Sequence, residues 1–397
     1  MDIDPIMNKV LILDPSCVAD SRTHNMNSVL GHARTFISAG YDVITGTNIK
    51  CNIDRKHIKN CPVFIYTIYD DHRKKRTGVY KRLLFMFYYR HLVRKTTKAI
   101  KLLIQNNDIG KHDHIFIPTT DWILFKSLLN IYSKKTNRPY LHLLLMYEKG
   151  RWMTGGYPYK RIINNLKYFG ELQKDIFIYT ETEQHAKNLS KSIGFIPPKY
   201  PFPSFPVTTG GKGLPTDKYT YIGVMGGGRK DKGFALLPMI ISKFNQRYNN
   251  HESTRFIIQK PRIEDRLDSE LHKLEQISNV LLLDNFLPWD KYCQYLVQCD
   301  IAIFPYSNVY FSRGSGLVNE AVAYNIPIIC SENTALTEAI THNNGKSARS
   351  VDEFADALIE IIENMNTYKD NAAMAKSEYL NKLHNNPVIV NIKKLSC

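Results

Sequence analysis

Two short segments of this chain combine glycines with basic residues, a pattern suited to holding a phosphate group. The first, residues 226–233, reads Gly-Gly-Gly-Arg-Lys-Asp-Lys-Gly and lies between an apolar run and an amphipathic stretch. Glycines such as Gly227 and Gly228 let backbone N–H groups approach an anion, and a helix start adds about half a positive charge. Arg229 and Lys232 supply a guanidinium and an ammonium for phosphate oxygens. The segment is neither Walker A nor G-x-G-x-x-G, so a solvated basic turn is the alternative interpretation.

The second segment, residues 311–321, also lies at the predicted start of a helix. Small residues there allow the backbone to approach a diphosphate closely. The candidate contacts are Ser312, Gly314, Ser315, Gly316 and Leu317. Glu320 follows about one turn later, and its carboxylate is a natural acceptor for paired ribose hydroxyls. The alternative is a glycine-rich helix start with an exposed glutamate.

Short apolar runs, each followed by an amphipathic stretch, indicate the elements that must position these segments. They occur at 10–13, 41–44, 63–66, 115–117, 141–146 and 176–179, and again at 219–224, 255–258, 280–283, 301–304 and 326–329. Such alternation is typical of parallel sheets covered on both faces. We predict an α/β protein with two doubly wound, Rossmann-like domains and an interdomain cleft at the carboxyl ends of their strands.

A stretch rich in proline and glycine, residues 197–218, separates the two series of runs and predicts an interdomain linker. The N-terminal domain is expected over residues 1–200 and the C-terminal domain over 218–375. A C-terminal helix at about 376–397 is expected to pack back on the first domain.

Composition limits the class of protein and its partners. The 397 residues carry 53 Lys and Arg against 37 Asp and Glu, and the net charge of +16 favours anionic partners. Apolar runs such as 83–89 are far shorter than the ~20 residues that cross a bilayer, and the acidic start is unlike a signal peptide. The seven cysteines form no C-x-x-C pair, which favours reduced thiols in the cytoplasm.

Together the two segments resemble the donor half of GT-B glycosyltransferases, in particular retaining, family-four-like enzymes. The resemblance covers most of 219–340. It rests on Arg-x-x-Lys-Gly at 229–233, Asp-Asn-Phe-Leu-Pro-Trp at 284–289, the strand and Pro-Tyr at 299–306, Ser315-Gly316 through Glu320-Ala321, and Ile-Pro-Ile-Ile at 326–329. Two positions depart from the family pattern. Ser312 stands where a second glutamate usually contacts the donor sugar, and Asn325 replaces a glycine.

The resemblance implies a hexosyltransferase-like enzyme in cell-surface polysaccharide biosynthesis. A nucleotide-diphosphate sugar would be the donor, a glycan or lipid-linked glycan the acceptor, and transfer would retain the anomeric configuration. Arg229 and Lys232 would be the catalytic pair on the diphosphate, the helix-start residues would bind phosphate oxygens, and Glu320 would bind the ribose. Two cations can replace a metal ion, and no Asp-x-Asp pair follows a strand, so neither a metal nor another cofactor is expected.

The N-terminal half resembles the family more loosely and is expected to shape the acceptor site. His24, in the loop at 14–25, and Glu148, after the run at 141–146, are candidate cleft residues. A solvated histidine and a surface ion pair are the respective alternatives.

Residues 72–107 contain no Asp or Glu, and their many Lys and Arg residues are interleaved with aromatic and aliphatic ones. This pattern predicts contact with an anionic membrane surface through about 72–101, which places the protein on the cytoplasmic, inner face of a membrane. A core-packed helix with a solvated basic face is the alternative. No recognition-helix, RRM or zinc pattern accompanies the charge, so no nucleic-acid partner is expected.

Two other functions remain open at this point. A GT-B-shaped sugar-nucleotide epimerase would need carboxylate acid/base residues around the sugar. A basic nucleic-acid-binding protein is predicted by charge alone and would bind DNA with a steep salt dependence.

Overall fold

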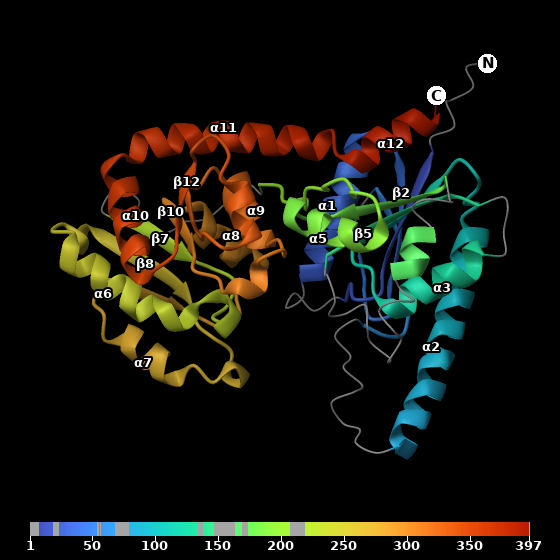
Figure 1. Cartoon of the computed structure of the whole chain (residues 1–397), viewed down its shortest axis with the longest axis horizontal. Helices are drawn as coiled ribbons and strands as arrows, with labels where there is room; N and C mark the ends of the chain where they lie inside the picture. The colour runs from blue at the N-terminus through green and yellow to red at the C-terminus, as the bar shows by residue number, and fades with distance from the viewer. Residues whose placement is uncertain are drawn as a thin grey trace. The chain divides into compact units, whose positions relative to one another are not determined.

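The computed structural model describes residues 8–18, 24–53, 55, 57–67, 79–133, 138–146, 163–168, 174–206 and 219–396. The chain divides into two compact units, one formed by residues 1–201 with 384–397 and the other by residues 202–383. Each unit is an α/β structure built on its own parallel sheet (Figure 1). The two doubly wound domains predicted from the apolar runs are therefore confirmed.

The first unit contains a six-stranded sheet in the order β3-β2-β1-β4-β5-β6. Neighbouring strands are parallel throughout. Their bounds are β1 Lys9–Asp14, β2 Asp42–Asn48, β3 Ile58–Phe64, β4 His114–Ile117, β5 Tyr140–Leu145 and β6 Ile176–Thr180. The strand order reverses between β1 and β4, the position at which doubly wound sheets bind ligands.

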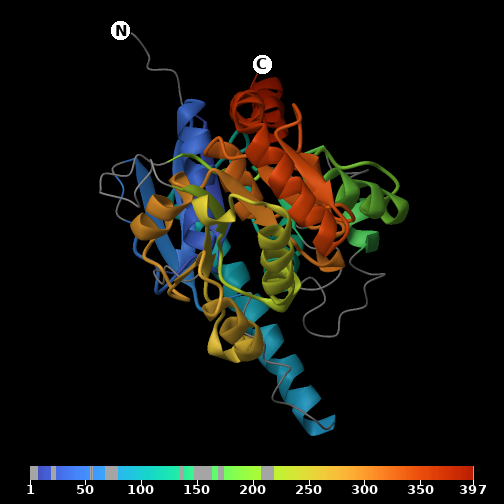
Figure 2. The same ribbon diagram turned by 90° about the vertical axis from the view of Figure 1, so that its left-hand side faces the viewer.

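Helices cover both faces of this sheet. Their bounds are α1 His24–Ser38, α2 Val79–Asn106, α3 Trp122–Tyr132, α5 Glu183–Ile193 and α12 Pro387–Ser396. One core joins α2, α3 and α5 to one face of the sheet, and another joins α1 and α12 to the opposite face. The N-terminal half of α2 extends away from the sheet (Figures 1 and 2).

The second unit repeats this topology, with a six-stranded parallel sheet in the order β12-β11-β10-β7-β8-β9. The bounds are β7 Thr220–Val224, β8 Thr254–Gln259, β9 Val280–Leu283, β10 Ile301–Phe304, β11 Ile328–Ser331 and β12 Gly345–Ala348. The strand order reverses between β7 and β10, which pair through Ile222 with Ile301. The edge strand β12 was not predicted, because its sequence Gly-Lys-Ser-Ala contains no apolar run.

The helices of the second unit also lie on both faces of its sheet. Their bounds are α6 Leu237–Arg247, α7 Asp268–Glu275, α8 Trp289–Val297, α9 Gly316–Ala323, α10 Val351–Glu363 and α11 Met365–His384. One core joins α6 and α10 to the sheet, and another joins α8, α9 and α11 to its other face. Short 3₁₀ turns at Lys230–Lys232, Phe234–Leu236 and Asn308–Tyr310 lie in the loops after β7 and β10.

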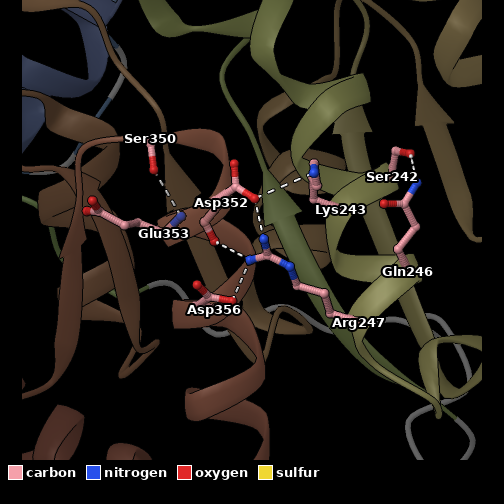
Figure 3. Close-up of polar contacts among 8 residues, drawn as sticks. All are labelled: Ser242, Lys243, Gln246, Arg247, Ser350, Asp352, Glu353 and Asp356. Carbon is pink, nitrogen blue, oxygen red and sulfur yellow. Dashed lines mark hydrogen bonds and ion pairs between the residues drawn. The ribbon is translucent and has the colours of Figure 1, made fainter.

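Helices α6 and α10 are also joined at their exposed edges by ion pairs (Figure 3). Arg247 of α6 contacts Asp352 and donates to Asp356 at 2.6 Å, and Lys243 lies 3.6 Å from Asp352. The Ser350 hydroxyl caps α10 by accepting the Glu353 amide at 3.2 Å. Because the charged groups are half exposed, each pair adds at most about 1 kcal/mol, and the apolar core remains the main stabilising contact.

The stretch predicted as a linker is packed against both units where the structure describes it. Tyr200 is fully buried in the first unit and its hydroxyl lies 2.9 Å from Nδ1 of His32. Tyr379 of α11 holds the next residues, because its hydroxyl donates to the Phe202 carbonyl and accepts the Ser204 amide. Helix α11 runs through residue 376 without a break, and the chain returns to the first unit at His384.

Candidate functional site

The glycine-rich loop lies at the carboxyl end of β7, directly at the reversal of strand order in the second sheet. Gly226 and Gly227 have φ of +94° and +73°, a backbone region that glycine adopts without strain. A Cβ on Gly226 would lie 2.1 Å from the Leu317 side chain, and one on Gly233 would lie 1.8 Å from the Pro305 carbonyl. Glycine at these positions therefore lets the loop pack directly on the start of α9 and the end of β10.

The amides of this loop already have protein acceptors. Gly226 and Gly227 both donate to Oε1 of Gln259 at 2.8 Å, and Gly228 donates to the Lys260 carbonyl at 3.3 Å. From the sequence, these N–H groups were predicted to bind a phosphate. In the structure these N–H groups hold the shape of the loop. Gly227 and Gly228 would therefore contribute only by lacking a Cβ, which lets a ligand approach the backbone closely.

Arg229 is fixed by two partners. Its guanidinium donates to both carboxylate oxygens of Asp231 at 2.9 and 2.8 Å, and to the Tyr310 hydroxyl at 2.9 Å. Tyr310 follows β10, and the guanidinium of Arg313 lies 5.2 Å from its ring centroid. The side chain of Arg229 is still 40% exposed, so the guanidinium can reach a ligand while held in one orientation.

Lys232 is buried, and its Nζ donates to the Gly226 carbonyl at 2.7 Å. Burial, together with the neighbouring Arg229 charge, lowers the pKa of Lys232 to about 7, while Asp231 and Glu320 oppose the fall. An ammonium held in so apolar a place is costly without an anion. A diphosphate bound beside it would remove that cost.

The start of α9 completes the site. Ser315 precedes the helix in extended conformation and its side chain makes no cap, so it does not satisfy the first-turn amides. Glu320 lies one turn inside, and the Tyr292 hydroxyl of α8 donates to its Oε2 at 2.5 Å. Burial raises the pKa of Glu320 to about 7, against the opposing effects of Tyr292 and Lys232.

The structure therefore brings the two predicted segments together at one edge of one sheet. The loop of Gly227, Gly228, Arg229 and Lys232 packs on the start of α9, where Ser315, Gly316, Leu317 and Glu320 lie. Ser312 and Gly314 lie in the approach to the same helix, partly exposed. Asn325, which stands in place of a family glycine, has φ +65°, a conformation that asparagine tolerates.

Sequence reasoning missed three residues of this site, namely Gln259, Tyr292 and Tyr310. Each acts through a contact with a residue far away in sequence, and no local motif marks it. The one available signal was position, because Gln259 ends β8 and Tyr310 lies in the loop after β10.

The candidate residues of the first unit are less defined. His24 begins α1, and nothing of its side chain is described, while Glu148 lies outside the described residues. The loop after β1 is held by Asp14, which is fully buried and accepts the Ser16 amide at 2.8 Å and the Asn25 side chain at 3.0 Å. Burial raises the pKa of Asp14 to about 7.

Within the described residues, no group of three or more His, Cys, Asp or Glu side chains could hold a metal ion. The adjacent Asp70 and Asp71, predicted to form a turn, lie outside those residues.

Solved structures with the same fold span the whole chain. A sucrose-phosphate synthase from Thermosynechococcus elongatus aligns with a TM-score of 0.64 at 11% identity, covering 98% of each chain. Alr3699/HepE from Anabaena, solved in complex with UDP and glucose, gives 0.60 at 13% identity over 98% of this chain and 97% of that one. A trehalose-6-phosphate synthase studied for glycosyl transfer with retention gives 0.64 at 11% identity over 98% and 99%. At such identities the likeness shows the fold, which is GT-B.

The family match lies on the second unit. Residues 218–364 match the family model described as glycosyl transferases group 1. The second unit therefore carries a glycosyl transferases group 1 domain, in a chain that has the GT-B fold. The matched range contains both segments predicted from the sequence, from Gly226 to Glu320. No curated protein sequence matches the chain significantly.

Proposed function

We propose that this glycosyltransferase moves a sugar from a nucleotide-diphosphate donor to a glycan or lipid-linked glycan in cell-surface polysaccharide biosynthesis. The observation that carries the donor assignment is the meeting of Arg229, Lys232 and the start of α9 at the reversal of strand order. The complex of the similar Anabaena protein with UDP and glucose supports the same donor class. Retention is proposed from the family resemblance and from the similar trehalose-6-phosphate synthase.

In the proposed reaction, the bond between the anomeric carbon and the diphosphate breaks and negative charge grows on the leaving diphosphate. An acceptor hydroxyl oxygen bonds to that carbon, and its proton leaves with the diphosphate. The Arg229 guanidinium, already oriented by Asp231 and Tyr310, would take up part of that charge. Lys232 and the first-turn amides of α9 would take up more, and the burial of Lys232 strengthens its interaction with the diphosphate. We propose that these groups suffice without a metal ion.

Glu320 would accept the ribose hydroxyls of the donor. Its partial burial and its bond from Tyr292 give it a fixed position one turn from the proposed phosphate site. His24 and Glu148 remain the proposed acceptor-side residues.

A thermal-shift panel tests the donor assignment. We expect UDP, GDP or ADP, or a corresponding nucleotide sugar, to raise the unfolding temperature, because a ligand that binds only the folded chain stabilises it. The shift should persist in excess EDTA. If none of these compounds changes the unfolding temperature at millimolar concentration, the proposed function is wrong. A shift abolished by EDTA would overturn the metal-free part alone.

We further propose that α2 contacts the anionic inner face of a membrane. Arg90, Arg94, Lys95, Lys98 and Lys101 are all exposed on this helix, and Phe87 is 65% exposed near its projecting half. The opposite side is a core face, since Leu92, Val93 and Ile100 are buried against the first unit. Residues 72–78 and the side chains of 79–86 lie outside the description. No helix in the described part of the chain is both long enough and apolar enough to cross a membrane.

Vesicle sedimentation tests this surface. The protein should bind vesicles containing phosphatidylserine and leave neutral ones in solution. Changing Arg94, Lys95 and Lys98 to glutamine should weaken binding about fivefold per charge, since each nearby basic residue contributes ~1 kcal/mol. The matched control is Lys187→Gln with Lys191→Gln on α5, which removes exposed charge elsewhere on the same unit. Equal binding to both vesicle types, or equal loss in the control, would contradict the proposal.

A further inference from the structure

The contact between Tyr292 and Glu320 joins two helices of the second unit that are separate in sequence. Tyr292 lies on α8, Glu320 on α9, and the phenol donates to Oε2 of the carboxylate at 2.5 Å. Tyr292 is 7% exposed, whereas Glu320 is only partly buried. Tyr292 contacts Oε2 of the carboxylate, so Glu320 keeps acceptor capacity for a hydrogen bond from a ligand.

Tyr292 is itself held in place. The ring of Trp289 stacks on it with centroids 5.4 Å apart and an angle of 18° between the planes. Tyr292 also belongs to the core that joins α8 and α9 to the sheet. The phenol has little freedom to leave Glu320, so the bond fixes the carboxylate in one rotamer.

The same bond favours the ionised form of Glu320. Burial raises the pKa of Glu320 to about 7, and the Tyr292 hydroxyl is the strongest group that opposes the rise, followed by Lys232. A carboxylate that is protonated offers one acceptor fewer and cannot receive two ribose hydroxyls equally. Without the phenol, more of the glutamate would be neutral near pH 7.

We propose that Tyr292 is a positioning residue that holds Glu320 in the orientation that accepts the ribose hydroxyls of the donor, and so makes the site selective for ribonucleotides over 2′-deoxyribonucleotides. This inference rests on the proposed function, since it concerns how the nucleotide of the donor is recognised. Tyr292 touches no substrate in this account and acts through Glu320 alone.

Binding of UDP, GDP and ADP and of their 2′-deoxy forms, measured by calorimetry from pH 5.5 to 8.5, tests the inference. The wild-type chain should prefer the ribonucleotide by about tenfold or more at pH 7.5, the effect of a hydrogen bond to a charged group. The preference should fall as Glu320 takes up a proton. In Tyr292→Phe the preference should be largely lost, and its fall should begin at a higher pH. Tyr295→Phe, the same change on the same helix, should behave as wild type.

Glu320→Gln keeps the test decisive if Tyr292→Phe fails to fold. This variant should lose the ribose preference at every pH, while the wild-type preference changes around pH 7. A ribose preference that Tyr292→Phe retains with an unchanged pH profile would overturn the inference and leave the donor assignment standing. A preference that Glu320→Gln retains would overturn it as well. If the wild-type chain binds none of the six nucleotides, the inference and the proposed function fall together.

Discussion

Lys232→Ala is expected to reduce turnover about 1,000-fold while the second unit stays folded. The ammonium is buried beside the Gly226 carbonyl and the start of α9, so it would face the diphosphate in a place where water cannot replace it. Its lowered pKa reflects the cost of burying that charge, and its loss should therefore leave the unfolding temperature unchanged or higher. Steady-state kinetics with the donor from the thermal-shift panel, together with thermal unfolding, measure both effects.

Arg229→Ala should reduce turnover by about 100-fold or more, because the guanidinium is the other cation of the pair. This variant also leaves Asp231 and Tyr310 without their shared partner, so a small loss of stability is expected. Lys230→Ala is the matched control, since Lys230 lies between the two residues but is exposed. An unchanged rate in Arg229→Ala or Lys232→Ala, or an equal loss in Lys230→Ala, would remove the assignment of the catalytic pair.

Donor affinity is expected to be greatest near neutral pH and to fall on both sides. Burial lowers the pKa of Lys232 to about 7 in the free protein, and a bound diphosphate would raise it. Binding then takes up a proton above pH 7, so affinity falls by up to about tenfold per pH unit until the pKa of the complex is reached. On the acid side, Glu320, whose pKa burial raises to about 7, becomes protonated and loses its ribose contact. Lys232 and Glu320 influence each other's pKa, so the fall in affinity on either side of neutral pH reflects the titration of both groups together.

Two variants assign the limbs of this pH profile. Lys232→Arg keeps its charge at every pH in the range and should flatten the alkaline limb. Glu320→Gln should remove its share of the acid limb and leave only the protonation of the nucleotide phosphate, whose second pKa is about 6. Calorimetry in two buffers of different ionisation enthalpy should detect proton uptake by the wild-type chain at pH 8. A profile that is flat from pH 7 to 9 would show that Lys232 does not meet the diphosphate.

Much of the fold could be predicted because its strands are buried on both sides. Runs such as 301–304 are apolar without interruption, which identifies them as strands of a covered parallel sheet. The edge strand β12 has no such run, since only part of it is buried, and it was missed. The loop motifs could be predicted too, because the residue types alone, glycine with lysine and arginine, indicate phosphate binding.

The contacts between the loops could not be predicted in the same way. Gln259 takes the amides of Gly226 and Gly227, and Tyr292 reaches Glu320, through side chains that meet only after the sheet has formed. The surface of α2 shows the same limit. Leu92 and Arg94 alternate in sequence as they would on a membrane-facing helix, but Leu92 is in the core. The sequence therefore indicated which residue types this helix carries, but not which of them face the core and which face solvent.

A crystal structure of the chain with the nucleoside diphosphate that gives the largest thermal shift tests the central claim most directly. The account predicts both phosphates within about 3 Å of Arg229, Lys232 or the first-turn amides of α9, with the ribose on Glu320. A diphosphate bound elsewhere, with the loop at 226–233 and the start of α9 free of ligand, would contradict it.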